Sequence, residues 1–441
     1  MKEPLRIGVA GLGTVGASVI RILNTQASLI EEKTGRPVVV TAVSARDRSK
    51  DRGIDLSGYQ WFDNAADMAA SSDVDCIVEL IGGADGMAYE TIEKAIANGK
   101  HVVTANKALL AKHGLKLAAA AEKKDTALAF EASVAGGIPV IKILREGMSA
   151  NRIKRIYGIL NGTCNYILSR MENERMTFQD CLKDAQKLGY AEADPTFDVE
   201  GFDTAHKLAL LSSLAFGTEV DADSIYVEGI SSISPLDITM AGELGYRIKL
   251  LGVAEYGKNG LEQRVHPTMV PKTSAIAQVM GVTNAVTIDA DAVKELTLIG
   301  PGAGGDATAS AVVADLTDVA ADAVPLPFGV SAASLIKATS AGMQLHQGGY
   351  YIRLMVHDRP GVAAGVATRM AEEEISLESI LQKRPDSEQP SADRTGRSGT
   401  PVPLVLITYA AEESRIRSAL ARISADGLTA EEPQLIRIER E

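Results

Sequence analysis

The first 135 residues alternate between short apolar runs and stretches with helical periodicity. Residues 5–10 form an apolar run, and the glycine-rich segment 11–16 leads into a stretch whose apolar residues fall on one side of a helix. Further strands are expected in the apolar runs at 38–43, 74–81 and 101–104. Strands that alternate with helices predict a parallel sheet covered by helices on both faces.

After about residue 135 the pattern changes to longer strands. The runs 247–256 and 261–270 flank Lys258-Asn259-Gly260, whose Asn-Gly pair favours a tight hairpin turn. This second part of the chain is therefore expected to contain antiparallel sheet. Two predicted helices complete it, one following the glycine-rich stretch 300–306 through Val319 and one near 331–343.

The last ninety residues predict a third unit with the order βαββαβ, which is the ferredoxin-like arrangement. The expected elements are a strand at 350–357, a helix at 361–373, strands at 375–382 and 402–410, a helix at 412–425 and a strand at 434–438. Residues 383–403, between the second and third strands, are rich in Pro, Ser, Asp and Gly and bury almost nothing. We expect a flexible loop there.

Charge and composition narrow the classes of partner. The 441 residues carry a formal net charge of −12, which disfavours a broad attraction to nucleic acid or to an anionic membrane surface. No apolar run approaches the roughly 18–20 residues that span a bilayer, and no export signal precedes the first strand. Three scattered cysteines, Cys76, Cys164 and Cys181, suggest neither disulfides nor a zinc site. We expect a cytoplasmic protein in which Cys164 is a buried thiol.

The segment GLGTVG at 11–16 has the form of a dinucleotide-binding turn. Gly11 permits the tight turn, Gly13 lets the backbone approach a pyrophosphate, and Gly16 allows close helix packing. The following strand ends near Arg46, where an NAD-specific fold usually has an acidic residue. Arg46 could pair with a 2′-phosphate and favour NADP, although Asp47 keeps NAD possible and a solvated basic turn is the alternative.

Residues 185–207 hold the most informative chemistry. Asp203 and Lys207 fall at i and i+4 on a probable helix, downstream of a stretch crowded with the carboxylates Glu192, Asp194, Asp198 and Glu200. A lysine beside carboxylates can exchange a proton with a substrate oxygen while hydride moves at the neighbouring carbon. From spacing alone, an ordinary helix pair worth roughly 0.3–0.5 kcal/mol is the favoured interpretation.

A longer pattern resembles a known family. The run AxxxGYAxxDPxxDVxGxDxxxK at 185–207 resembles the signature of the homoserine dehydrogenases at every fixed position. The resemblance extends through GLGTVG, VVTANKALL at 102–110, EASVAGGIPVI at 131–141, NGTCNYIL at 161–168 and GPGAGG at 300–305. It implies NAD(P)-dependent interconversion of L-homoserine and L-aspartate 4-semialdehyde, in threonine, methionine and isoleucine biosynthesis.

The resemblance also implies roles for individual residues. Lys207 would donate and accept the proton, Lys107 would lie beside substrate and nicotinamide, and Glu192 and Asp203 would hold the homoserine. By sequence alone, Lys107 could equally be a surface lysine. Tyr190, Thr163 and Asp198 are further substrate-side candidates that could instead be structural hydrogen-bonders. The cofactor-contacting set would be Gly11, Leu12, Gly13, Thr14, Val15, Gly16, Arg46, Thr104, Lys107, Gly189 and Gly302.

A monovalent cation, usually sodium, is a further family property. Glu131, Val134, Gly136 and Ile138 match the positions that hold it, and a carboxylate with backbone carbonyls suits a hard cation. Without the resemblance, EASVAGG at 131–137 indicates only a turn.

The C-terminal unit resembles an ACT domain through HDRPGVAAGVATRMAEEEISLESI at 357–380. The resemblance implies feedback inhibition by L-threonine, with Asp358 and Gly361 at the effector site. The resemblance to the homoserine dehydrogenases implies a homodimer or homotetramer, because edge strands of the second domain pair between subunits in that family. A dimerisation module without a ligand is the alternative. We also expect the monofunctional form, without a fused kinase.

Together these features predict an α/β protein with three domains. Residues 1–135 would form a Rossmann NAD(P)-binding domain. Residues 136–345 would form an α+β catalytic and dimerisation domain whose last helices return to the Rossmann domain, and residues 349–441 a ferredoxin-like ACT domain. Two rival functions remain open: a dehydrogenase that forms a thioester on Cys164, such as aspartate-semialdehyde dehydrogenase, and a non-enzymatic amino-acid sensor.

Overall fold

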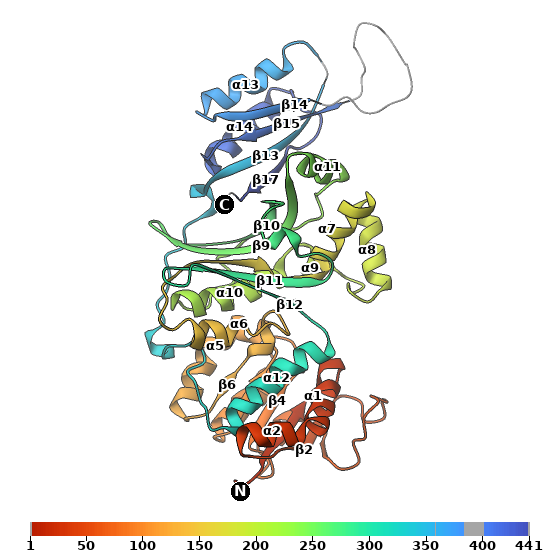
Figure 1. The fold of residues 1–441 in the computed structure, drawn as a ribbon, viewed down its shortest axis with the longest axis vertical. Helices are drawn as coiled ribbons and strands as arrows, with labels where there is room; N and C mark the ends of the chain where they lie inside the picture. The colour runs from red at the N-terminus through yellow and green to blue at the C-terminus, as the bar shows by residue number, and fades with distance from the viewer. Residues whose placement is uncertain (1, 358, 383–400, 440–441) are drawn as a thin grey trace.

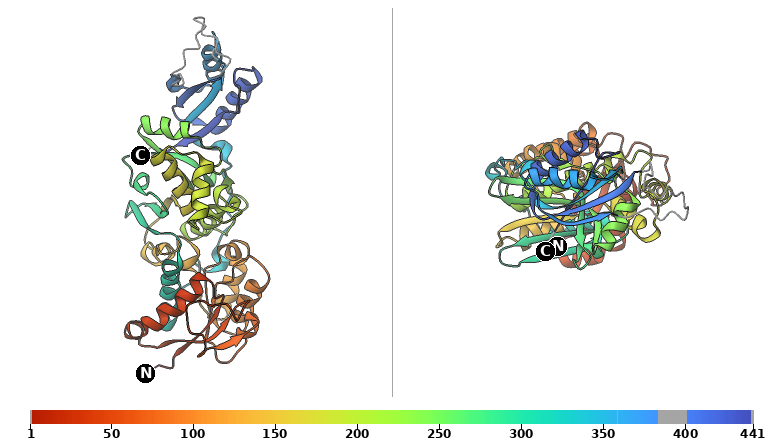
Figure 2. Two further views of the ribbon diagram at one scale, coloured as in Figure 1. Left: turned by 90° about the vertical axis from the view of Figure 1, so that its right-hand side faces the viewer. Right: turned by 90° about the horizontal axis from the view of Figure 1, so that it is seen from above.

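The computed structural model describes residues 2–357, 359–382 and 401–439. Three bodies follow one another along the axis of an elongated molecule, with the N-terminal body at one end and the C-terminal body at the other (Figures 1 and 2). We call them the N-terminal, middle and C-terminal domains. Within the described residues, no helix combines the length and hydrophobicity needed to cross a bilayer.

The N-terminal domain has a six-stranded sheet with the order β3-β2-β1-β4-β5-β6. All five neighbouring pairs are parallel, as the alternation of strands and helices predicts. Its elements are β1 (Leu5–Ala10), α1 (Thr14–Thr25), α2 (Ala27–Thr34), β2 (Val38–Ser44), β3 (Gln60–Phe62), α3 (Ala65–Met68), β4 (Cys76–Glu79), α4 (Met87–Ala97), β5 (His101–Thr104), α5 (Lys107–Lys123) and β6 (Leu128–Ala129).

The middle domain is built on an antiparallel sheet with the order β12-β11-β7-β9-β10. The predicted hairpin is confirmed, because Gly257 pairs with Gly260 across the turn between β9 and β10. Its elements are α6 (Val140–Lys142), a π-helical stretch (Ile143–Gly147), β7 (Ile153–Ile159), α7 (Gly162–Glu174), α8 (Phe178–Lys187), α9 (Thr196–Val199), α10 (Phe202–Phe216), β8 (Tyr226–Val227), α11 (Pro235–Glu243), β9 (Tyr246–Gly257), β10 (Gly260–Pro271), β11 (Thr283–Ala290) and β12 (Glu295–Pro301).

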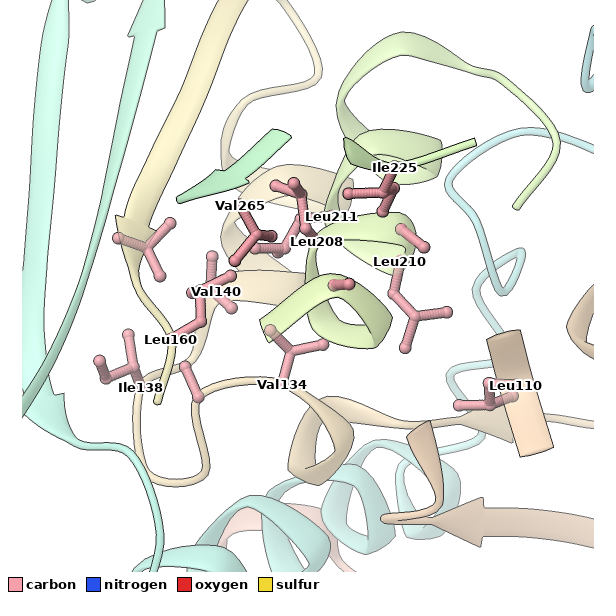
Figure 3. Close-up of a cluster of buried hydrophobic side chains, with 14 of the residues drawn as sticks. Leu110, Val134, Ile138, Val140, Leu160, Leu208, Leu210, Leu211, Ile225 and Val265 are labelled. Atoms are coloured by element: carbon pink, nitrogen blue, oxygen red, sulfur yellow. The ribbon is translucent and has the colours of Figure 1, made fainter. Parts of the chain in front are cut away.

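Helix α10 is central to the core of the middle domain. Leu208 and Leu211 are buried and lie beside Val140, Leu160 and Val265, so α10 is packed between the sheet and the junction with the N-terminal domain (Figure 3). Fully burying a leucine contributes about 1.5–3 kcal/mol, which fixes the position of this helix. Any polar side chain on α10 is therefore held in a rigid frame.

The C-terminal domain has the predicted βαββαβ order. Its elements are β13 (Gln347–Val356), α13 (Val362–Glu372), β14 (Leu377–Gln382), β15 (Val402–Thr408), the two-residue strand β16 (Ala411–Glu412), α14 (Glu413–Ala425) and β17 (Gln434–Ile438). The strands lie in the order β17-β13-β15-β14. Strand β17 also pairs in parallel with β10, so one continuous sheet runs through the middle and C-terminal domains.

One prediction about the fold is wrong, and another falls mostly outside the described residues. Helix α12 (Gly305–Ala320) does return to pack on α1, but the helix expected near 331–343 is absent. That segment contains only short 3-10 turns, because Ile336 and Ser340 instead form isolated bridges with Thr218 and Leu261. Of the predicted loop at 383–403, residues 383–400 lie outside the described residues and 402–403 belong to β15.

Candidate active site

The Asp203–Lys207 pair lies in the first turns of α10. Gly201 precedes the helix with a φ of +89°, a conformation that favours glycine and turns the chain sharply into α10. The Lys207 Nζ lies 2.7 Å from Asp203 Oδ2, and the two side chains are only 12% and 7% exposed. This burial distinguishes the pair from an ordinary surface helix pair.

A second lysine reaches the same carboxylate from the N-terminal domain. Lys107 is the first residue of α5, directly after β5, and its Nζ lies 3.0 Å from Asp203 Oδ1. Burial alone would raise the pKa of Asp203, but the charges of Lys207 and Lys107 outweigh it and lower that pKa. Asp203 is therefore an ionised carboxylate that bridges two lysines across the domain junction.

The segment after β7 supplies two contacts that the sequence analysis did not assign. Lys207 Nζ donates a hydrogen bond to the backbone oxygen of Leu160 at 2.7 Å. The Asn161 side-chain amide donates to Asp203 Oδ2 at 2.8 Å and to Asp198 Oδ1 at 2.9 Å, while its oxygen caps α7. An asparagine directly before a predicted helix is an N-cap signal, and this signal in NGTCN could have identified Asn161.

The other predicted substrate-side residues are only partly brought to this cluster. Asp198 joins it through Asn161, and burial raises the pKa of Asp198. The Thr163 hydroxyl donates to the backbone oxygen of Tyr190 at 2.7 Å, and the Tyr190 ring, 44% exposed, lies edge-on to that of Tyr166. Glu192 is exposed, and its carboxylate contacts neither lysine among the described residues.

The predicted dinucleotide turn borders a cavity of about 600 Å³. A Cβ at Gly11 would collide with the backbone of Leu80, and a Cβ at Gly16 would collide with that of Gly11, so both positions require glycine. At Gly13 nothing lies within 4 Å of an added Cβ, which leaves the backbone open to a ligand. Gly13 also caps α1 without a side-chain hydrogen bond, so the amides of Thr14 and its neighbours face a space suited to an anion.

Basic residues border the same cavity. Arg46 and Lys50 line it and are exposed, whereas Arg52 donates to the backbone oxygen of Leu12 at 3.0 Å and braces the glycine turn. The Asp47 carboxylate accepts hydrogen bonds from the hydroxyl and the backbone amide of Ser49, which lower the pKa of Asp47. The first acidic group after β2 is thus engaged in its own turn.

The remaining predicted cofactor residues lie in several different elements. Thr104 is fully buried and donates to Glu79 Oε2 at 2.6 Å. A Cβ at Gly136 would collide with the Gly302 backbone, so these two glycine turns are in contact. Gly189 has a φ of +76° and ends α8. Val15 lies in the first turn of α1 and is partly buried.

The predicted cation residues form a buried turn at the junction. Glu131 is 1% exposed, and its two carboxylate oxygens accept hydrogen bonds from the backbone amides of Ile141 and Lys142 at 2.9 and 2.8 Å. Burial raises the pKa of Glu131 despite these bonds. Val134 and Ile138, which follow Glu131 in the sequence, are also buried. Among the described residues, no group of three or more His, Cys, Asp or Glu side chains is arranged to hold a metal ion.

Cys164 is a buried thiol, as expected. Its Sγ donates to the backbone oxygen of Asp198 at 3.2 Å, and burial raises its pKa well above the usual range. A thiol of this kind is a poor nucleophile. The geometry therefore gives no support to a thioester-forming dehydrogenase.

Comparisons with known proteins identify the family to which the chain belongs. The homoserine dehydrogenase family model matches residues 139–317, and the model of the homoserine dehydrogenase NAD-binding domain matches residues 11–131. The homoserine dehydrogenase of Pseudomonas aeruginosa is 44% identical over 96% of both chains, and that of Neisseria gonorrhoeae is 44% identical over 99% of both. A crystal structure of a homoserine dehydrogenase from Thiobacillus denitrificans superposes with a TM-score of 0.91 at 43% identity, covering 100% of this chain and 99% of the other. The chain therefore belongs to the homoserine dehydrogenase family.

Proposed function

We propose that this NAD(P)-dependent oxidoreductase interconverts L-homoserine and L-aspartate 4-semialdehyde at the cluster formed by Lys107, Asp203 and Lys207. The observation that carries the proposal is the buried Asp203 carboxylate held between lysines of two domains. A substrate bound there lies at the junction between the dinucleotide turn and the middle domain.

Lys207 is the proposed proton donor and acceptor. The nicotinamide, when bound, supplies or accepts the hydride. In the reductive direction the Lys207 ammonium donates a proton to the aldehyde oxygen, and in the oxidative direction Lys207 receives the hydroxyl proton. The contacts of Lys207 with Leu160 and Asp203 orient its Nζ for this transfer.

The carboxylates hold the substrate amine in this proposal. Asp203 and Glu192 accept hydrogen bonds from the homoserine ammonium, with Tyr190, Thr163 and Asp198 around them. Lys107 offers a positive charge to the substrate carboxylate or to the developing oxyanion.

The cofactor is proposed to be NADP in preference to NAD. Arg46 lines the cavity beside Gly11 and Gly13, and neither the Arg46 guanidinium nor the Lys50 ammonium has a hydrogen-bond partner among the described residues. A 2′-phosphate would satisfy both charges. Leu12, Thr14, Val15, Thr104, Gly189 and Gly302 complete the proposed cofactor-contacting set.

A sodium ion is the proposed structural cation. The Glu131 carboxylate is buried and carries a raised pKa, so a cation beside it would offset the cost of its charge. Glu131 with the backbone oxygens of Val134, Gly136 and Ile138 would hold it. The ion would stabilise the turn at the domain junction and take no part in proton transfer.

Regulation and assembly are also proposals. Residues 1–135 would bind the cofactor, residues 136–345 would carry catalysis and dimerisation, and residues 349–441 would regulate the enzyme. L-threonine is the proposed effector of this ACT-like C-terminal domain. Gly361 has a φ of +93° at the start of α13, whereas Asp358 lies outside the described residues. A homodimer or homotetramer in the cytoplasm is expected, and the three unpaired, buried cysteines suit a reducing compartment.

The test is the absorbance of reduced nicotinamide when L-homoserine is supplied with NADP or with NAD, each with and without L-threonine. Turnover is expected with both cofactors and faster with NADP. Lys207→Met should lower kcat by about 10²–10⁴-fold, the usual contribution of acid–base catalysis, while NADPH fluorescence titration shows unchanged binding. Absence of homoserine turnover with either cofactor would refute the proposal.

A further inference from the structure

A buried ionic cluster joins the C-terminal domain to the middle domain. Arg437 of β17 has a side chain only 2% exposed, and its Nε donates to Glu413 Oε2 at 2.9 Å within its own domain. Its two Nη groups bind the carboxylate of Glu228, which follows β8 of the middle domain. Arg437 thus connects carboxylates of two domains.

A second arginine strengthens the same connection. Arg417 of α14 donates to Glu228 Oε1 at 3.0 Å and to the Tyr226 hydroxyl at 2.7 Å. Burial alone would raise the pKa of Glu228, but Arg437 and Arg417 lower it. Glu228 is therefore an ionised side chain that binds two arginines of the C-terminal domain as well as the Tyr226 hydroxyl of its own domain.

The backbone around Glu228 supports the turn that begins α10. The Ile230 amide donates to the backbone oxygen of Val199 at 2.9 Å. A Cβ at Gly229 would collide with Val199 and with Glu200, so the segment after β8 and the end of α9 are in direct contact. A Cβ at Gly201 would lie 3.1 Å from a Val227 methyl carbon and 3.6 Å from the backbone oxygen of Glu228, so the turn packs closely against this segment.

That turn determines where Asp203 stands. Gly201 is the N-cap of α10, and Asp203 follows two residues later with Lys107 and Lys207 on its carboxylate. We propose that Glu228 is a positioning residue. Held by Arg437 and Arg417, it fixes the position of the α9–α10 turn and therefore the position of Asp203 relative to the substrate. This inference rests on the function proposed for Asp203, and it gives the C-terminal domain a direct physical route to the active site.

The same domain junction offers a matched comparison. Asp237 of α11 is also a buried carboxylate that binds the C-terminal domain, through Arg353 Nε at 2.8 Å and the Tyr351 hydroxyl at 3.0 Å. Its other hydrogen bonds are with Ser234 at the start of α11, and among the described residues none joins its carboxylate to the α9–α10 turn. A purely structural role for the junction predicts similar consequences for Glu228 and Asp237.

The experiment compares Glu228→Gln with Asp237→Asn in the full-length protein, since each replaces a carboxylate by its isosteric amide. Glu228→Gln is expected to lower kcat/KM for L-homoserine about tenfold, with KM for NADP within twofold of wild type. Asp237→Asn is expected to leave both parameters within twofold, even where it lowers the melting temperature as much. Equal losses in the two variants, or unchanged homoserine kinetics in Glu228→Gln, would overturn the proposal.

A second readout does not depend on turnover. Amide hydrogen exchange in the first turn of α10, residues 202–206, should be faster in Glu228→Gln than in Asp237→Asn, because only Glu228 supports that turn. If wild-type protein showed no homoserine turnover, the proposed function would fail, yet this comparison would still decide the positioning role. Equal exchange in both variants would reject it.

Discussion

Asp315 is a buried carboxyl group whose ionisation should govern how stability depends on pH. It lies on α12, the helix that returns to the N-terminal domain, and its side chain is 1% exposed. Its Oδ2 accepts a hydrogen bond from the Glu131 amide at 2.9 Å, and Lys142 Nζ lies 4.0 Å from Oδ1. Burial, together with the nearby Glu131 charge, raises the pKa of Asp315 to about 7.

The sign and size of the effect follow from the two states. In the unfolded chain the pKa of an aspartate is about 3.9, so the shift on folding is about 3 units. Above about pH 4 the unfolded chain releases this proton while the native protein keeps it, so the free energy of unfolding falls by about 1.36 kcal/mol per pH unit. The loss ends near the native pKa of about 7, where it reaches about 4 kcal/mol.

Asp315→Asn removes this titration while its amide oxygen can still accept from Glu131. Relative to wild type, the variant should gain roughly 3 kcal/mol in free energy of unfolding between about pH 5 and about pH 8. Urea unfolding followed by fluorescence would measure this, because the only tryptophan, Trp61, lies in β3 of the N-terminal domain. Tetramethylammonium buffers would keep alkali cations away from Glu131.

Asp318→Asn is the matched control on the same helix. Asp318 pairs with Lys142, and its side chain is 32% exposed. Asp318→Asn should therefore lower the free energy of unfolding by under about 1 kcal/mol, by a similar amount at about pH 5 and about pH 8. If Asp315→Asn followed the wild-type pH dependence, Asp315 would be ionised in the native protein and the burial argument would be wrong.

Three further predictions concern the cofactor, the core and the thiol. Arg46→Asp should lower kcat/KM for NADP about tenfold or more and leave that for NAD within a few-fold, which steady-state kinetics would show; an unchanged NADP preference would remove Arg46 from the phosphate site. Leu208→Ala should cost about 3–4 kcal/mol in urea unfolding, because Leu208 is fully buried in the middle-domain core; a cost below about 1 kcal/mol would contradict this packing. Native activity should resist iodoacetamide, because Cys164 is buried and its pKa is raised; rapid inactivation with labelling of Cys164 would refute this.

The sequence predicted the features that depend on neighbouring residues. The glycine turn at 11–16, the hairpin at Asn259-Gly260 and the βαββαβ order of the last domain all follow from local periodicity and turn chemistry. The prediction of a helix near 331–343 was wrong, because bridges to the distant residues Thr218 and Leu261 favour an extended chain there. Local propensity is a weak determinant when tertiary pairing competes with it.

The pairing of β17 with β10 could not be predicted in the same way. Within the described residues two residue pairs join the strands, Thr268 with Arg437 and Met269 with Ile438, and more than 160 residues separate them in the chain. No periodicity in either strand identifies such a partner. The ionic cluster around Glu228 depends on this pairing, so it too was invisible in the sequence.

The active-site cluster shows where the limit lies. The spacing of Asp203 and Lys207 indicates a shared helix face, and that much is local. Spacing says nothing of burial, and it is burial that changes the chemistry, because exposed pairs of this kind contribute about 0.3–0.5 kcal/mol and lose their charge interactions to water. In the structure one carboxylate serves both Lys107 and Lys207, and the Asp203 and Lys207 side chains are only 7% and 12% exposed. Asp203 compensates only one of the two lysine charges. The remaining positive charge can bind the substrate carboxylate or stabilise the negative charge that develops on the substrate oxygen.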